Sequence, residues 1–185
     1  MSGIKEANAG GNPGQHLMKL GIRAVVVKGQ PADRNKRYGL RVNGETVEVV
    51  AADDYKGMWN YALCAKLLEN EAKTASVISI GPAGEHMMSG ASVACTDQDK
   101  ERRPARHAAR GGLGAVMGSK GLKWVLVDPG KSPLRKAAEA KAYTALNKGK
   151  SKEYVEGPQM FKYGTSSVVP VANMLNTFVY KNRTE

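Results

Sequence analysis

Apolar and polar residues alternate along this 185-residue chain with two periods, one typical of strands and one typical of helices. Apolar runs that are rich in β-branched residues and bounded by glycine predict strands. Such runs lie at residues 22–29, 75–81, 87–95 and 122–128. Residues 38–50 alternate apolar and polar positions on both sides of Asn43-Gly44, which is the strongest two-residue signal for a β-hairpin. The first two thirds of the chain therefore carry a sheet.

Helical spacing is found in the segments between these strands and after them, at residues 14–21, 54–73, 112–121, 132–150 and 165–178. In the second segment, Met58, Ala62, Ala65 and Leu68 recur at the helical period and predict one buried face. Strands mixed with short helices predict the α+β class. The last two segments predict that the chain ends in two helices.

The chain is basic, with 28 Lys and Arg against 17 Asp and Glu, a net charge of +11 and a pI near 9.7. Such a charge favours an anionic partner, which can be nucleic acid, an acidic protein surface or a phosphorylated cofactor. Many of the cations fall in two runs, at residues 100–110 and 148–154. A solvated surface explains such runs equally well, so charge alone does not choose the partner.

The two cysteines, Cys64 and Cys95, are far apart and belong to no Cys-x-x-Cys pair, which excludes a disulfide framework and a zinc knuckle. A reducing, cytoplasmic location fits this pattern, and the sequence contains neither a signal-peptide pattern nor an apolar run long enough to span a membrane. His16, His86 and His107 are scattered. The sequence therefore predicts no catalytic constellation and no metal site built from side chains.

Residues 110–123, "RGGLGAVMGSKGLK", are dense in glycine. They are not a phosphate-binding P-loop, because the order Gly118-Ser119-Lys120 does not match its Gly-Lys-Ser/Thr sequence, and Met117 replaces the last glycine of a dinucleotide fingerprint. Arginines near Gly111 and Gly112, with main-chain N–H groups at a helix start, would suit a phosphate. Alternatively, the glycines only let a short helix pack closely against the sheet.

Several blocks together resemble a known family. "ANAGG" at 7–11, "LGIRAVVVKG" at 20–29, "ISIGPAGE" at 78–85 and "RHAARGGLGAVMGSKGLK" at 106–123 occur in the order found in the N-terminal domain of the aldehyde:ferredoxin oxidoreductases, the tungsten-pterin enzymes. Residues 163–178 are similar to the segment that leads into the second domain of that family. The resemblance implies an α+β fold with a saddle of two β-sheets, on which a bis-pterin tungsten or molybdenum cofactor sits.

The resemblance also implies which residues contact that cofactor. They are Asn8, Gly10, Gly11, Arg106, His107, Ala109, Arg110 and Gly111. Asn8 and His107 are expected to act partly through backbone atoms, which in the family help to hold a magnesium ion between the two phosphates. Ala109 stands where the family commonly has glycine. The glycines would allow the backbone to approach the cofactor closely.

The same resemblance divides the chain into a pterin-cradling domain at 1–130, incomplete at its start, and a helical segment at 131–185 that leads into a second domain not contained in this sequence. The cysteines that bind the family's [4Fe–4S] cluster belong to later domains.

The resemblance also implies partners. They are a chain or domains that carry these cysteines, ferredoxin, and a second copy of this chain in a homo-oligomer. Neither a membrane nor nucleic acid is a favoured partner. The implied activity is oxidation of an aldehyde to a carboxylic acid, with electrons passed through the cluster to ferredoxin. The alternative function is a non-catalytic remnant or a basic module that binds nucleic acid or an acidic protein.

Overall fold

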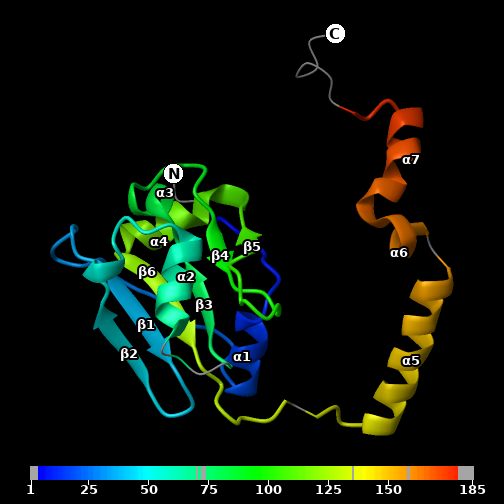
Figure 1. The fold of residues 1–185 in the computed structure, drawn as a ribbon, viewed down its shortest axis with the longest axis horizontal. Coiled ribbons are helices and arrows are strands. Elements are labelled where there is room, and N and C mark those ends of the chain that lie inside the picture. The colour runs from blue at the N-terminus through cyan, green and yellow to red at the C-terminus, as the bar shows by residue number, and fades with distance from the viewer. Residues whose placement is uncertain (1–3, 70, 72–73, 135, 158, 179–185) are drawn as a thin grey trace. The chain divides into compact units, whose positions relative to one another are not determined.

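The computed structural model describes residues 4–69, 71, 74–134, 136–157 and 159–178. The chain divides into two compact units, a first unit of residues 1–135 and a second unit of residues 136–185 (Figure 1). All strands of the described residues lie in the first unit, and the second unit is helical.

One mixed sheet forms the centre of the first unit. Its strands are β1 (Tyr38–Val42), β2 (Val47–Ala51), β3 (Ser76–Ser79), β4 (Val93–Cys95), β5 (Arg106–Ala108) and β6 (Leu122–Val127). They lie in the order β2-β1-β6-β3-β4-β5, in which only β1 and β6 are parallel neighbours. The α+β class is thus confirmed. Within the described residues, however, this single sheet replaces the expected saddle of two sheets, because no second set of paired strands forms.

Short helices lie around this sheet (Figure 1). They are α1 (Pro13–Lys19), α2 (Asn60–Glu69), α3 (Pro82–Glu85) and α4 (Leu113–Ser119), together with the 3-10 turns η1 (Asp53–Tyr55) and η2 (Arg110–Gly112). Helix α2 covers one face of the sheet, where Leu63 and Leu67 pack in one buried cluster with Trp124. On the opposite face, Leu17 of α1 packs against a second cluster that contains Leu40. The sheet therefore has an apolar core on both sides.

The hairpin predicted at residues 38–50 is confirmed. β1 and β2 pair antiparallel, with Val42 opposite Val47. The side-chain oxygen of Asn43 accepts hydrogen bonds from the backbone N–H groups of Glu45 and Thr46, both at 2.8 Å. This Asx turn stabilises the reversal of the chain, as expected for asparagine at the start of a turn.

Two predictions about local structure are wrong. Residues 22–29 are not a strand, and much of this segment is exposed, including Val26 at 73%. The apolar run is present, but none of the described strands pairs with it. In α2, Leu68 is buried as predicted, but Ala62 and Ala65 are exposed and Leu63 and Leu67 are buried instead, so the buried face is rotated from the predicted one.

A buried ion pair joins several elements of the first unit. The Lys123 ammonium lies 2.9 Å from the Glu85 carboxylate, and their side chains are 0% and 4% exposed. The ammonium also donates a hydrogen bond to the Met58 carbonyl oxygen at 2.9 Å, and the carboxylate accepts one from the Gly57 N–H at 2.9 Å. Burial lowers the pKa of Lys123, and the contact with Glu85 opposes this shift. The pair connects β6, α3 and the loop before α2.

The second unit contains α5 (Ala140–Glu156), α6 (Gln159–Tyr163), the 3-10 turn η3 (Gly164–Val168) and α7 (Val169–Met174). The helix predicted at 132–150 starts at Ala140, and the helix predicted at 165–178 is divided into η3 and α7. None of the described residues of α5 is buried. No helix in the described part of the chain is long and apolar enough to cross a membrane.

Candidate cofactor-binding site

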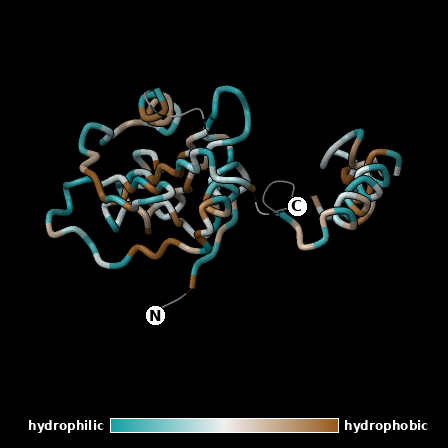
Figure 2. The backbone as a smooth tube through the Cα atoms, turned by 90° about the horizontal axis from the view of Figure 1, so that it is seen from below, coloured by the Kyte–Doolittle hydropathy of each residue, from teal (hydrophilic) through white to brown (hydrophobic). Residues whose placement is uncertain are grey.

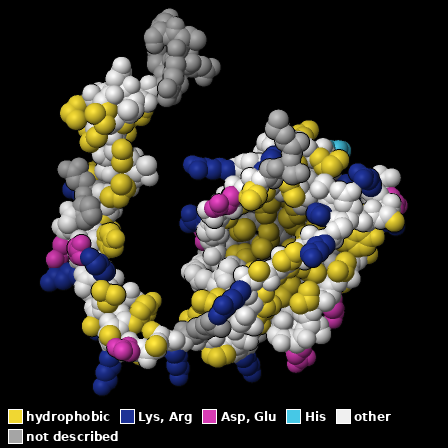
Figure 3. Space-filling view, turned by 180° about the vertical axis from the view of Figure 1, so that it is seen from behind, with side chains coloured by type: hydrophobic (Ala, Val, Ile, Leu, Met, Phe, Trp, Pro, Cys, Tyr) yellow, Lys and Arg dark blue, Asp and Glu magenta, His cyan; other side chains and the backbone are white. Residues whose placement is uncertain are grey.

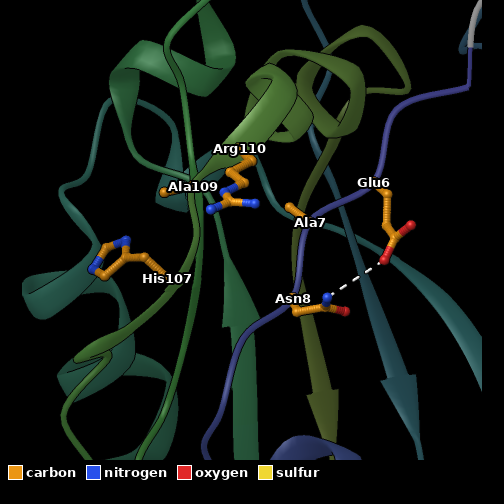
Figure 4. Close-up of a pocket in the computed structure, with 6 residues that line it drawn as sticks. All are labelled: Glu6, Ala7, Asn8, His107, Ala109 and Arg110. Carbon is orange, nitrogen blue, oxygen red and sulfur yellow. Dashed lines mark hydrogen bonds between the residues drawn. The ribbon is translucent and has the colours of Figure 1, made fainter. Parts of the chain in front are cut away.

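An open cavity of about 600 Å³ lies between the N-terminal loop and the segment that follows β5. Its lining residues are Glu6, Ala7, Asn8, His107, Ala109 and Arg110 (Figure 4). Two blocks about 100 positions apart in the sequence, 7–11 and 106–111, therefore meet at one place. Of the eight residues expected to contact a cofactor, Asn8, His107, Ala109 and Arg110 line the cavity, and the other four lie on the same two segments.

The N-terminal loop is held against the sheet by the fully buried Thr96. The Asn12 N–H donates to the Thr96 carbonyl oxygen at 3.1 Å, and the Thr96 hydroxyl donates to Asn12 Oδ1 at 2.8 Å. The same hydroxyl accepts a hydrogen bond from the Val77 N–H at 3.0 Å. Gly11 has φ +98°, and a Cβ there would overlap the Thr96 carbonyl oxygen. Gly11 is thus required for close approach to the protein's own backbone.

On the other side of the cavity, Arg106 is already paired. Its Nε donates to the Asp97 carboxylate at 2.6 Å. The pKa of Asp97 is lowered, mainly by a hydrogen bond from the Gln98 N–H and next by the one from Arg106. A Cβ on Gly10 would lie 3.7 Å from Arg106 Cδ, so the N-terminal loop passes directly beside this arginine. Arg106 therefore links β5 to both neighbouring loops.

His107 and Arg110 point in different directions. The Nδ1 atom of His107 lies 3.0 Å from the Ser92 hydroxyl, and its ring points away from the loop that carries Asn8 (Figure 4). The guanidinium of Arg110 points from its backbone toward the N-terminal loop (Figure 4). Glu6, also at the cavity, accepts a hydrogen bond from the side-chain amide of Asn8 at 3.4 Å. Arg110 is therefore the cation best placed to meet a ligand in this cavity.

The glycines that follow Arg110 serve two different purposes. Gly111 and Gly112 have φ of +71° and +67°, a left-handed conformation that glycine adopts without strain. They turn the chain from the cavity into α4. Within α4, a Cβ on Gly114 would crowd the backbone before β4, and one on Gly118 would overlap the carbonyl oxygen of Gly84 in α3. Of the two interpretations of this glycine-rich stretch, close packing of a short helix therefore accounts for Gly114 and Gly118.

The residues around the cavity fit an anionic group that approaches the backbone. The aliphatic part of the Lys5 side chain packs beside Gly111, with the Lys5 Cβ 3.5 Å from where a Cβ on Gly111 would lie. Ala109 has an ordinary backbone conformation, with φ −100° and ψ −13°, so its methyl group causes no strain. Guanidinium and ammonium groups, with main-chain N–H groups exposed by glycine, are the donors that phosphate requires.

The two cysteines and His16 lie in the core of the first unit. Burial raises the pKa of the Cys64 and Cys95 thiols to about 11, so both are protonated at neutral pH. His16 is buried and its Nδ1 lies 2.7 Å from the Ser76 hydroxyl. Among the described residues, no three His, Cys, Asp or Glu side chains gather in a way that could hold a metal ion. The sequence did not indicate Lys5, Glu6 or Thr96. Lys5 and Glu6 precede the block at 7–11, whereas Thr96 follows β4 and flanks neither block.

Comparisons with known proteins show the family of the chain. Residues 1–129 match the family described as aldehyde ferredoxin oxidoreductase, N-terminal domain. Similar relatives are the tungsten-containing aldehyde ferredoxin oxidoreductases of Pyrococcus furiosus and Pyrococcus horikoshii, which are 31% identical over 191 residues and 32% identical over 186 residues. Each alignment covers 97% of this chain but 28% of the relative. The chain thus spans less than a third of the length of these relatives.

One solved structure is also similar. It is titled "Active site complex BamBC of Benzoyl Coenzyme A reductase in complex with 1,5 Dienoyl-CoA", and the match has a TM-score of 0.68 with 29% sequence identity. The match covers 80% of this chain and 21% of that chain. A related oxidoreductase therefore contains a similar fold, over the matched part, within a longer polypeptide.

Proposed function

Because the chain belongs to the aldehyde ferredoxin oxidoreductase family, we propose that its first unit cradles a bis-pterin cofactor of tungsten, or of molybdenum, in the cavity beside Arg110. The observation that carries this proposal is the meeting of residues 6–8 with residues 107–110 around one open cavity. The cofactor's phosphates are anionic, and the cavity is lined by the guanidinium of Arg110, with the carboxylate of Glu6 beside Asn8.

The roles of individual residues follow from where their atoms lie. Arg110 would pair with phosphate oxygens, and Lys5 would add positive charge beside Gly111. Asn8 and His107 would contribute main-chain groups to a magnesium ion between the phosphates, which is compatible with a His107 ring engaged by Ser92. Arg106, held by Asp97, would orient the edge of β5 and contribute to the local positive charge.

The metal would supply the redox chemistry, and this chain would supply binding and orientation. The full activity proposed is conversion of an aldehyde and water to a carboxylic acid, with two protons released to solvent and two electrons passed to ferredoxin through an iron–sulfur cluster. The cysteines for that cluster would come from a second chain or from further domains, since the chain corresponds to 28% of its relatives.

The test is elemental analysis of the tagged protein purified without oxygen from its native host. We expect tungsten or molybdenum together with iron and a cysteine-bearing polypeptide. The Arg110→Gln variant should contain several-fold less tungsten or molybdenum, whereas Arg34→Gln, which removes an arginine outside the cavity, should keep the wild-type amount. Purified protein that contains neither metal nor a partner would contradict the proposal.

A further inference from the structure

Asp97 lies just after β4 and does not line the cofactor cavity, yet its carboxylate holds Arg106 at the start of β5. The two residues are neighbours at the end of the β4-β5 pair, because Cys95 is the register partner of Arg106. The Arg106 Nε donates to the Asp97 carboxylate at 2.6 Å, which is short enough for a charge-assisted hydrogen bond. Asp97 is therefore in a position to orient an arginine that belongs to the expected cofactor site.

The backbone before Asp97 is fixed independently of Arg106. The preceding residue, Thr96, is fully buried, and its hydroxyl donates to Asn12 Oδ1 and accepts from the Val77 N–H. These hydrogen bonds attach Thr96 to the N-terminal loop and to β3. A carboxylate that follows such an anchored residue has little freedom to move with the arginine.

The loop that begins at Asp97 is polar and is held by hydrogen bonds. Residues 97–103 are all hydrophilic, and Figure 2 shows them in teal. The Asp97 N–H donates to the Arg103 carbonyl oxygen at 2.9 Å, and the Gln98 N–H donates to the Asp97 carboxylate at 2.8 Å. The carboxylate is thus oriented by its own loop, so it offers Arg106 an acceptor at a fixed place.

Asp97 engages only one edge of the Arg106 guanidinium. Within the residues that the structure describes, Nε is the only nitrogen of this side chain that forms a hydrogen bond. A guanidinium is planar with its N–H donors in fixed directions, so fixing Nε restricts where the Nη donors can point. The aliphatic part of the side chain passes beside Gly10, with Arg106 Cδ 3.7 Å from where a Cβ on Gly10 would lie. The Nη groups are thus available to a ligand, on an arginine that is held beside the N-terminal loop.

Positive charge alone does not account for this arrangement. Figure 3 shows Lys and Arg side chains spread over one face of the first unit. The Asp97 carboxylate even offsets part of the charge of Arg106, which weakens the attraction of an anion. What the carboxylate adds is orientation, because a long side chain that is already ordered loses less conformational entropy when it binds a ligand.

We propose that Asp97 is a positioning residue that orients the Arg106 Nη groups toward a phosphate of the bound cofactor without touching the cofactor itself. This role rests on the proposed function, because the cofactor supplies the phosphate. It has a consequence that opposes simple electrostatics. Removal of the Asp97 charge should weaken the binding of an anion, although removal of a nearby negative charge would by itself strengthen it.

The test is NMR spectroscopy of the full chain without cofactor, with inorganic pyrophosphate as the anionic probe and the Arg106 Nε–H signal as the readout. In the wild type we expect this proton to exchange slowly with solvent, because the Asp97 carboxylate accepts it, and we expect pyrophosphate to shift the signal. Asp97→Asn should speed the exchange and weaken pyrophosphate binding about tenfold, because a neutral amide is a weaker acceptor than a carboxylate.

The matched control is Glu101→Gln, the same charge change in the same loop at a residue that pairs with Arg103. This variant should leave the exchange of the Arg106 proton unchanged. It should bind pyrophosphate at least as tightly as the wild type, because it removes a negative charge and leaves the Asp97–Arg106 pair intact.

Orientation, folding and charge have different effects in this test. The Asp97–Arg106 pair is partly exposed, so Asp97→Asn should unfold at nearly the urea concentration that unfolds the wild type. The proposal is overturned if Asp97→Asn binds pyrophosphate as tightly as the wild type or more tightly, or if pyrophosphate leaves the Arg106 signal of the wild type unchanged. Tungsten content is measured separately. Wild-type protein that contains tungsten but shows no effect of Asp97 would contradict the positioning role alone, and protein without metal that binds pyrophosphate through this pair would contradict the cofactor proposal alone.

Discussion

Replacement of Lys123 by methionine should unfold the first unit at much lower denaturant concentration, because Glu85 would keep a buried charge without its partner. The two side chains are 0% and 4% exposed, and within the described residues the carboxylate receives, apart from Lys123, only the Gly57 N–H. Removal of one member of a buried pair costs about 3–5 kcal/mol. For a unit of this size, that loss corresponds to a fall in melting temperature of roughly 10–15 °C.

A double-variant cycle separates the charge from the packing. Glu85→Gln alone leaves the ammonium buried without a counter-charge and should also destabilise. In the Lys123→Met/Glu85→Gln variant neither charge remains, and the side-chain oxygen of the introduced glutamine can still accept from the Gly57 N–H, so most of the stability should return.

Urea unfolding followed by tryptophan fluorescence is the suitable assay. Trp59 and Trp124 are the two tryptophans of the chain, and both lie in the first unit, so the signal reports this unit alone. The matched control is Lys36→Met, which removes an exposed lysine paired with Asp53 at 3.4 Å and should change stability little. A Lys123→Met variant within about 1 kcal/mol of the wild type would refute the reasoning, because so small a loss lies far below that of a broken buried pair.

Three further outcomes can be checked by the same unfolding assay. Gly118→Ala should lose about 1–3 kcal/mol because its Cβ would overlap α3, whereas Gly14→Ala, with open space around it, should lose nothing. Thr96→Val should lose about 2–4 kcal/mol, because two buried hydrogen bonds of the Thr96 hydroxyl disappear, and it should speed hydrogen exchange at Val77, whose N–H loses its acceptor; unchanged exchange at Val77 would contradict this. Burial lowers the pKa of His16 in the folded state, so as the pH falls the imidazole is protonated in the unfolded state before it is protonated in the folded state. The free energy of unfolding should therefore fall as the pH drops below 6.5, and it should fall less in His16→Gln.

The elements that the sequence predicted well are those decided by neighbouring residues. The hairpin depends on Asn43, whose side chain caps the turn. Residues 124–127 of β6 are apolar on both faces of the sheet, as their continuous apolar run indicated. Residues 23–29 have an equally good strand pattern. A strand also needs a partner, however, and the local sequence contains no information about whether one is present.

Packing decided the points that the sequence missed. In α2, the positions of Ala62 and Ala65 and those of Leu63 and Leu67 both follow the helical period, and the contact with the sheet selects the leucines. At the site, the sequence predicted that the glycine backbone approaches another group closely, but it did not indicate which group. Gly11 approaches Thr96 and Gly118 approaches α3, contacts between distant parts of the chain that no local pattern reveals.

The position of β6 also determines when the first unit can fold. β6 is the last strand of the unit in the sequence, but it lies between β1 and β3 at the centre of the sheet. Before residues 122–127 are synthesised, the nascent chain can form only two separate pieces, the hairpin β1-β2 and the meander β3-β4-β5. Late closure of long-range strand pairs makes folding slow and leaves apolar edges exposed on the ribosome. Strand order alone therefore favours slow and late folding of the first unit during synthesis.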